Sequence, residues 1–368
     1  MSLNYRKRII FLDLMRALAV LMMVQGHTID TFLGDQYRTF DSSMYDVWLT
    51  IRGFTAPIFM FTSGVAFTYL LKSYSKPFFE NPRVQKGFKR FLILVLIGYL
   101  LRFPTPRMFD FSEVTHAQWL TFFTVDALHL IGVGLFIILC LTYIAERYNQ
   151  NEYKVFLVGL IFFFALFPVT ESINWANYLP IPFAAYFYQG TGSLFPVFPW
   201  AGFVIAGGIL GAYLAKNPDC YYSPKFSYKL FALSAALILI SYLVNLLNQK
   251  YFGGNQEFFS DNVSLAYYRL GIVLTLNGLM ALISMRLKKI SEIVQQVGKN
   301  TLLIYAVHIV ILYGSAWVPG FGMFYPKSLN AIQSILAASL LIILMSGMVA
   351  FVEKIKTMKK RKFATVEA

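Results

Sequence analysis

The chain has 368 residues, of which 57% are hydrophobic and only 14% are charged. A water-soluble domain of this length does not need so much apolar surface, so the composition excludes that class and indicates a polytopic membrane protein. The formal net charge of +14 could indicate a nucleic-acid partner, but the placement of the basic residues, described below, argues against one.

Apolar segments of about 20 residues, the length that crosses a bilayer, predict ten membrane-spanning helices. Little chain remains for a soluble domain. The predicted fold is therefore an all-α integral membrane protein, a bundle of about ten transmembrane helices forming one domain over residues 1–368. The predicted spans are, in chain order, 9–28, 53–71, 88–104, 119–144, 153–169, 193–215, 228–247, 264–286, 300–318 and 329–352.

Lysine and arginine alternate along the chain between segments rich and poor in positive charge. With the amino terminus inside, most of the 32 basic residues fall in loops on the cytoplasmic side and in a basic tail at about 353–368. This asymmetry follows the positive-inside rule and predicts that both termini are cytoplasmic. The tail is expected to lie against anionic lipid head groups, so membrane lipids are predicted partners and nucleic acid is not.

The first predicted helix carries ionisable residues that its apolar surroundings do not explain. Arg16 and His27 are eleven positions apart, which returns a helix to within about 20° of the same face. Asp13 and Asp30 flank them at three residues on either side. Charged groups inside a bilayer-length helix are costly and commonly mark a cavity or reaction path. The alternative is an Asp13–Arg16 structural ion pair with an unrelated interfacial histidine.

Three of the four histidines fall in predicted spans, namely His27, His129 and His308. Histidine is the natural general base because its unperturbed pKa lies nearest neutral pH. Asp126 lies three residues before His129 and so shares its helix face, and Asp30 or Asp126 could orient a histidine base. A lone histidine such as His308 can equally be a satisfied core residue.

Three further features allow both a structural and a functional interpretation. Ser63 and Gly64 in the second span permit close helix packing or a substrate contact. Trp200 lies in a segment rich in proline and glycine, which is either a kinked helix or a broken helix that opens a ligand slot. Arg52, Arg102 and Arg269 are either snorkelling anchors or contacts to an anionic or sugar-like acceptor.

The common motifs of soluble enzymes are missing from the sequence. It contains no GxSxG, HExxH, Walker loop or GxGxxG after a strand. The two cysteines, Cys140 and Cys220, give no metal-binding spacing, and no metal is predicted. The cytoplasmic stretch 72–90 is strongly basic, and Lys86, Lys89 and Arg90 within it would attract a phosphate-bearing cofactor.

The ordered motifs of the chain resemble those of a known family. The opening of transmembrane acyltransferases resembles the segment FLDLMRALAVLMMVQGH (11–27). In that pattern an arginine comes three residues after an aspartate, and a histidine follows the arginine after ten intervening residues. APIFMFTSGVAF (56–67), DALHLIGVGLF (126–136) and GKNTLLIYAVHIVILYG (298–314) continue the likeness. The chain is most similar to bacterial proteins resembling the catalytic domain of heparan-α-glucosaminide N-acetyltransferase.

The resemblance implies acyl transfer, most simply of an acetyl group, from cytoplasmic acyl-CoA to a sugar hydroxyl or amine of a glycan or glycolipid at the outer side. His27 would act as the base or carry the acyl group, Arg16 would stabilise negative charge, and Asp13 would hold Arg16. Acceptor-side residues would be Asp30, Asp126, His129, His308, Ser63 and Trp200. The implied location is a bacterial inner membrane, with homo-oligomers allowed. The alternative function is a transporter or flippase of a small anion or lipid-linked sugar.

Overall fold

The computed structural model describes residues 9–39, 43–74, 76–252, 262–287 and 289–366. Within these ranges the regular elements are helices, joined by two isolated β-bridges, so the predicted all-α class is confirmed. The chain divides into two compact units. The first unit combines Met1–Thr55 with Met280–Ala368, and the second is Ala56–Leu279.

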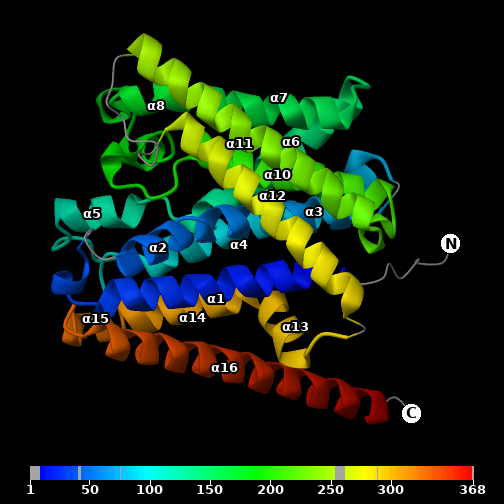
Figure 1. Cartoon of the computed structure of the whole chain (residues 1–368). Helices are drawn as coiled ribbons and strands as arrows, with labels where there is room; N and C mark the ends of the chain where they lie inside the picture. The colour runs from blue at the N-terminus through cyan, green and yellow to red at the C-terminus, as the bar shows by residue number, and fades with distance from the viewer. Residues whose placement is uncertain (1–8, 40–42, 75, 253–261, 288, 367–368) are drawn as a thin grey trace. The chain divides into compact units, whose positions relative to one another are not determined.

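The first unit is organised around helix α1, Ile10–Phe32. Three helices from the far end of the chain pack against α1, and Figure 1 shows α14 and α16 running beside it. They are α13 (Glu292–Lys299), α14 (Thr301–Tyr313) and α16 (Ala331–Val366); shorter elements of this unit are η1 (Asp35–Tyr37), α2 (Ser43–Arg52) and α15 (Phe321–Phe324). The connection from α15 to α16 follows the last turn of α1, where the Leu329 amide donates to the Phe32 carbonyl at 2.8 Å.

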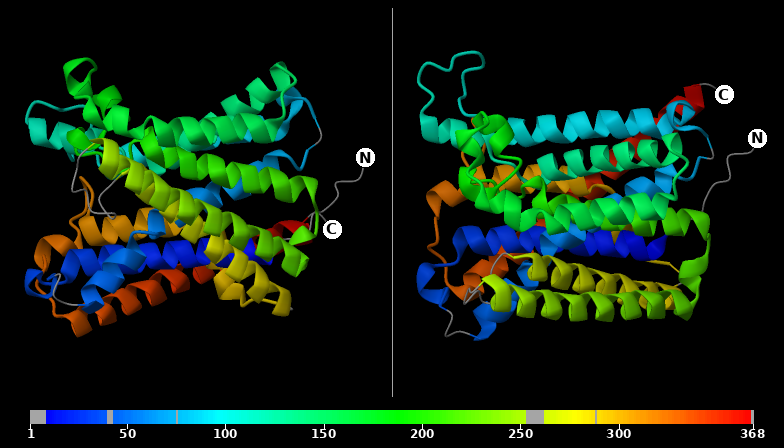
Figure 2. Two further views of the ribbon diagram at one scale, coloured as in Figure 1. Left: turned by 45° about the horizontal axis from the view of Figure 1, so that its top comes forward. Right: turned by 90° about the horizontal axis from the view of Figure 1, so that it is seen from above.

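The second unit is organised around α10, Val197–Lys216, whose residues are mostly buried. Helix α10 packs against α6 and α7, and α4 packs against α6 (Figures 1 and 2). The helices of this unit are α3 (Thr55–Leu71), α4 (Pro82–Leu101), α5 (His116–Phe123), α6 (Ala127–Arg147), α7 (Glu152–Ala165), α8 (Phe167–Ser172), α9 (Ile181–Ala184), α10, α11 (Pro224–Phe252) and most of α12 (Val263–Arg286). Single 3₁₀ turns lie between them at Phe78–Glu80, Trp175–Asn177, Gln189–Thr191 and Cys220–Tyr222.

Eight helical stretches in the described part of the chain are long and apolar enough to cross a membrane, which identifies a multi-pass integral membrane protein. Two of these stretches join consecutive helices: Met44–Leu71 runs through α2 and α3, and Glu152–Ser172 runs through α7 and α8. Two of the ten predicted spans fall outside this set. Helix α14 is apolar but has only 13 residues. Helix α4 has 20 residues, but four basic residues occupy its first half. The orientation of the termini stays a prediction.

Capping residues move several helix boundaries away from the predicted spans. The span predicted at 119–144 is two helices, because Asp126 caps the start of α6 with its carboxylate. The span predicted to begin at 88 begins at Pro82, because the Asn81 side chain accepts a hydrogen bond from the Arg83 amide at 2.9 Å. Residues predicted as a cytoplasmic loop up to 90, including Lys86 and Lys89, therefore lie on a helix.

Helices α3 and α10 approach so closely that glycine is required at their contact. A Cβ atom added at Gly64 would collide with the Val204 carbonyl oxygen, and one at Gly207 would collide with the Phe61 carbonyl oxygen. The neighbouring Ser63 hydroxyl donates to the Phe59 carbonyl of its own helix at 2.8 Å. This geometry agrees with close packing at the Ser63–Gly64 pair, while a substrate contact of Ser63 stays a prediction.

We expect Gly207→Ala to destabilise the protein by about 1–3 kcal/mol, because the added methyl group meets backbone that cannot rotate away. Thermal unfolding in detergent, followed by size-exclusion chromatography, measures the change. Gly347→Ala is the matched control, because a Cβ at that exposed position of α16 meets nothing within 4 Å. Equal melting temperatures for the two variants would contradict the proposed contact.

Candidate active site

The ionisable stripe predicted in the first span lies on one uninterrupted helix. Helix α1 runs from Ile10 to Phe32 without a break, so Arg16 and His27 share a face about 16 Å apart along the axis. Asp13 is buried, and Arg16 and His27 are half-buried. Gly298 of α13 lies directly on the Asp13 backbone, where an added Cβ would be 2.6 Å from the Asp13 carbonyl oxygen.

His27 lies against a second histidine. The rings of His27 and His308 meet edge to face with centroids 5.3 Å apart, and Tyr313 contacts the His27 ring at 5.8 Å. His308 is fully buried, and its Nδ1 lies 2.7 Å from the carbonyl oxygen of Ile304, one turn earlier on α14. A carbonyl oxygen only accepts hydrogen bonds, so Nδ1 carries the proton and Nε2 is the free acceptor of this imidazole.

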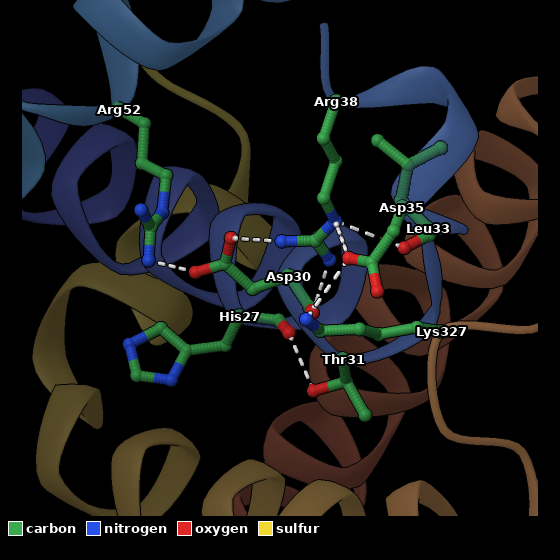
Figure 3. Close-up of polar contacts among 8 residues, drawn as sticks. All are labelled: His27, Asp30, Thr31, Leu33, Asp35, Arg38, Arg52 and Lys327. Carbon is green, nitrogen blue, oxygen red and sulfur yellow. Dashed lines mark hydrogen bonds and ion pairs between the residues drawn. The ribbon is translucent and has the colours of Figure 1, made fainter.

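One turn beyond His27, the Asp30 carboxylate joins two arginines from different segments (Figure 3). One carboxylate oxygen pairs with the Arg52 guanidinium at the end of α2, and the other lies 3.8 Å from Arg38. The Arg52 side chain also crosses Gly26, with its Cγ 3.5 Å from the position of a Cβ there. Arg52 is thereby held beside His27.

The same arginine network ties the end of α1 to the chain that follows it and to the α15–α16 connection. Arg38 donates to the backbone carbonyls of Leu33 at 3.0 Å and Asp30 at 2.6 Å. The Asp35 carboxylate forms an ion pair with Lys327, whose Nζ lies 2.9 Å from Asp35 Oδ1 (Figure 3). These bonds close the polar end of α1 within the first unit.

The second unit contains its own base and orienting carboxylate at the start of α6. His129 is fully buried, and its Nδ1 lies 2.9 Å from Asp126 Oδ1. The other Asp126 oxygen faces Arg102 at 3.6 Å. Asp126 therefore caps α6, orients the imidazole and neutralises an arginine at once.

The His129 ring is fully buried, and its Nε2 has no hydrogen-bond partner among the described residues. It lies on Gly98 of α4, and its centroid is 4.3 Å from that of Tyr99, whose hydroxyl is 3.2 Å from the Tyr186 hydroxyl. Asp126 and His129 are in contact, as the sequence predicts, but Asp126 is the capping residue before α6 rather than a residue on its face. Their role toward a substrate stays a prediction.

Trp200 lines a small hollow of about 10 Å³ in the second unit, room for about one water molecule, together with Gln189, Asn262 and Arg269. The guanidinium of Arg269 lies 5.7 Å from the centre of the Trp200 ring. The segment is bent rather than straight, because Phe198 leaves helical geometry immediately before Pro199. This arrangement agrees with the kinked alternative for the segment, while a substrate contact of Trp200 stays a prediction.

The basic residues predicted to bind the cofactor form an exposed face near the start of α4. Lys86, Lys89 and Arg90 are three and four residues apart and therefore neighbours on the helix surface. All three are exposed. Several fixed cations on one helix face suit a phosphate-bearing molecule better than the flexible loop expected from the sequence.

The structure brings Asp30 and His308 together with His27 in the first unit, and places Asp126, His129, Ser63 and Trp200 in the second. Sequence reasoning missed Arg38, Lys327 and Tyr313 as members of the polar end of α1. The position of Arg52 at the edge of an apolar segment could have indicated its role in this polar end. Nothing in the sequence pointed to Lys327, because its partner Asp35 is far away along the chain.

We expect Asp30→Asn to lower stability by about 1–2 kcal/mol, between the values of exposed and buried ion pairs, since Asp30 is about one fifth exposed and compensates two arginines. Thermal unfolding of the purified protein measures this change. Asp110→Asn is the control, because its pair with Arg107 is exposed, and its melting temperature should not move. A similar effect of both variants would contradict the network.

Comparison with known proteins places these clusters in a family. No curated protein matches the chain. The sequence model of a family described as heparan-α-glucosaminide N-acetyltransferase, catalytic, matches residues 8–247, well over half of the chain. The match contains the whole ionisable stripe of α1, the basic face of α4 and the Asp126–His129 pair. The chain therefore belongs to the heparan-α-glucosaminide N-acetyltransferase catalytic-domain family of membrane acetyltransferases.

Proposed function

We propose that this protein is a membrane-embedded acyltransferase that moves an acetyl group from cytoplasmic acetyl-CoA to a sugar hydroxyl or amine at the outer side of the membrane. Membership of the acetyltransferase family supports the reaction type and the donor. The observation that carries the proposal to particular residues is the half-buried stripe of α1, with His27 packed against a second histidine and followed by a neutralised Asp30.

In this proposal His27 reacts and Arg16 stabilises charge. A half-buried imidazole can take the proton of an acceptor hydroxyl or amine, or can itself carry the acetyl group. Attack on the thioester places negative charge on the carbonyl oxygen and then on the departing sulfur. A guanidinium on the same helix face can stabilise that charge in a site of low dielectric constant, and Asp13 holds the guanidinium in place.

Donor and acceptor enter from opposite sides. The exposed bases of α4 bind the phosphates of coenzyme A, which keeps its charged nucleotide outside the apolar part of the membrane. Asp30, His308, Asp126, His129, Ser63 and Trp200 serve the acceptor side. The acceptor is a glycan or glycolipid of a bacterial envelope, and the protein resides in the inner membrane with both termini cytoplasmic.

Labelled acetyl-CoA, given to the purified protein with an extract of envelope lipids and glycans, tests the reaction through the release of free coenzyme A. We expect His27→Ala and Arg16→Ala each to reduce release by about a hundredfold or more, because they remove the base and the charge-stabilising group. Mass spectrometry of the extract then identifies the acetylated acceptor.

The matched controls are His116→Ala and Arg107→Ala, since both residues are exposed in the connection before α5 or at its start. Both controls should keep full activity. Normal release by the His27 and Arg16 variants, at normal melting temperature, would remove the proposed site. No release by the wild-type protein from acetyl-CoA or longer acyl-CoA would overturn the proposed reaction.

Replacing Lys86, Lys89 and Arg90 together by glutamine should raise the KM for acetyl-CoA about tenfold with little change in kcat, because these cations bind the donor and do not enter the chemistry. Added salt should weaken donor binding in the wild type more than in the variant. A changed kcat with an unchanged KM would contradict this assignment.

A further inference from the structure

His308 has a side chain whose hydrogen bonding is only half satisfied. It is fully buried, and its Nδ1 proton is fixed by the Ile304 carbonyl at 2.7 Å. Its other nitrogen, Nε2, is buried without a hydrogen-bond partner among the described residues. A buried acceptor that is left unpaired costs free energy, so it calls for an explanation through function.

The titratable groups nearest this imidazole are the ones with which it can exchange a proton. The titratable side chains in ring contact with it are His27 of α1 at 5.3 Å and Tyr305 of its own helix at 5.7 Å. Helix α16 carries no ionisable residue before Glu353, and α15 carries none. Lys299 of α13 pairs with Glu353 at 3.4 Å, near the other end of α1, since neighbouring Gly298 lies on Asp13.

We infer that His308 is the proton acceptor of His27 during acyl transfer. The inference rests on the proposed function and adds a residue outside the range that the family match covers, residues 8–247. Because His308 has no exposed surface, it acts on the substrates through His27 and does not touch the bulk solvent.

The step balances whichever way His27 participates. If His27 attacks the thioester, a carbon–nitrogen bond forms, the carbon–sulfur bond breaks, and the resulting acylimidazolium loses its remaining ring proton to His308 Nε2. If His27 instead takes the proton of the acceptor, it becomes an imidazolium and passes its other ring proton to the same atom. In both cases His308 becomes a cation and later returns its proton to His27: when the acyl group leaves His27 for the acceptor in the first case, and when His27 protonates the departing thiolate in the second. The proton that the acceptor loses ends on the thiolate of coenzyme A. No electron donor or oxidant is needed.

Asparagine and glutamine at position 308 separate this role from a structural one. Asparagine can keep an N–H directed at the Ile304 carbonyl, as Nδ1 does, but has no group at the position of Nε2. Glutamine reaches the position of Nε2 but cannot take up a proton near neutral pH. If His308 only holds α14 in shape, His308→Asn should behave as the wild type.

We expect His308→Asn and His308→Gln to slow single-turnover release of coenzyme A from acetyl-CoA by about a hundredfold or more, with an unchanged KM for acetyl-CoA. The remaining rate should rise steeply with pH, because hydroxide must then remove the proton. The melting temperature of His308→Asn should equal that of the wild type. His116→Asn is the matched control, since His116 is exposed.

A second readout is independent of activity. The chain contains only four histidines, so a spectrum of protein labelled with ¹⁵N-histidine can be assigned with one variant per residue. His308 should show a protonated Nδ1 and an unprotonated Nε2. A proton on Nε2, or a wild-type rate and pH profile for His308→Asn, would overturn the inference and leave the proposed function intact. Wild-type protein that releases no coenzyme A would overturn the proposed function and, with it, this step.

Discussion

Helix α1 must carry charged groups through an apolar environment, and the rest of the first unit is arranged to meet that constraint. An unpaired carboxylate or guanidinium inside the membrane costs free energy. Asp30 is compensated by Arg38 and Arg52 together, and Arg38 also satisfies the carbonyls at the end of the helix. The polar end of α1 is therefore closed by its own neighbours, and His27 is held beside an arginine.

Both buried histidines of the spans are held through Nδ1. In His308 this nitrogen donates to a backbone carbonyl, and in His129 it lies 2.9 Å from the Asp126 carboxylate and accepts from the Asp126 backbone amide at 3.3 Å. In each case groups of the same helix or its cap fix the orientation of the ring. The two differ in their surroundings. His308 contacts another imidazole, whereas His129 is enclosed by Gly98 and Tyr99.

Helical periodicity was enough to predict the fold class, the position of α1 and the shared face of Arg16 and His27. It could not predict contacts between segments that are far apart in the sequence. His27 with His308 and Asp35 with Lys327 depend on how α14 and the α15–α16 connection pack on α1. Helix ends at Asn81 and Asp126 were missed because a single capping side chain outweighs hydropathy there.

The family match and the first unit do not have the same limits, and the difference has a physical consequence. The match ends at residue 247, but α13, α14 and α16, which cover α1, all follow it. Without these helices the buried Asp13 would lose the packing of Gly298, and His27 would lose the His308 ring. The ionisable stripe lies within the matched residues, but the helices that pack on it and shield it from lipid lie beyond them. The folded unit that encloses the stripe of α1 therefore extends beyond the matched sequence.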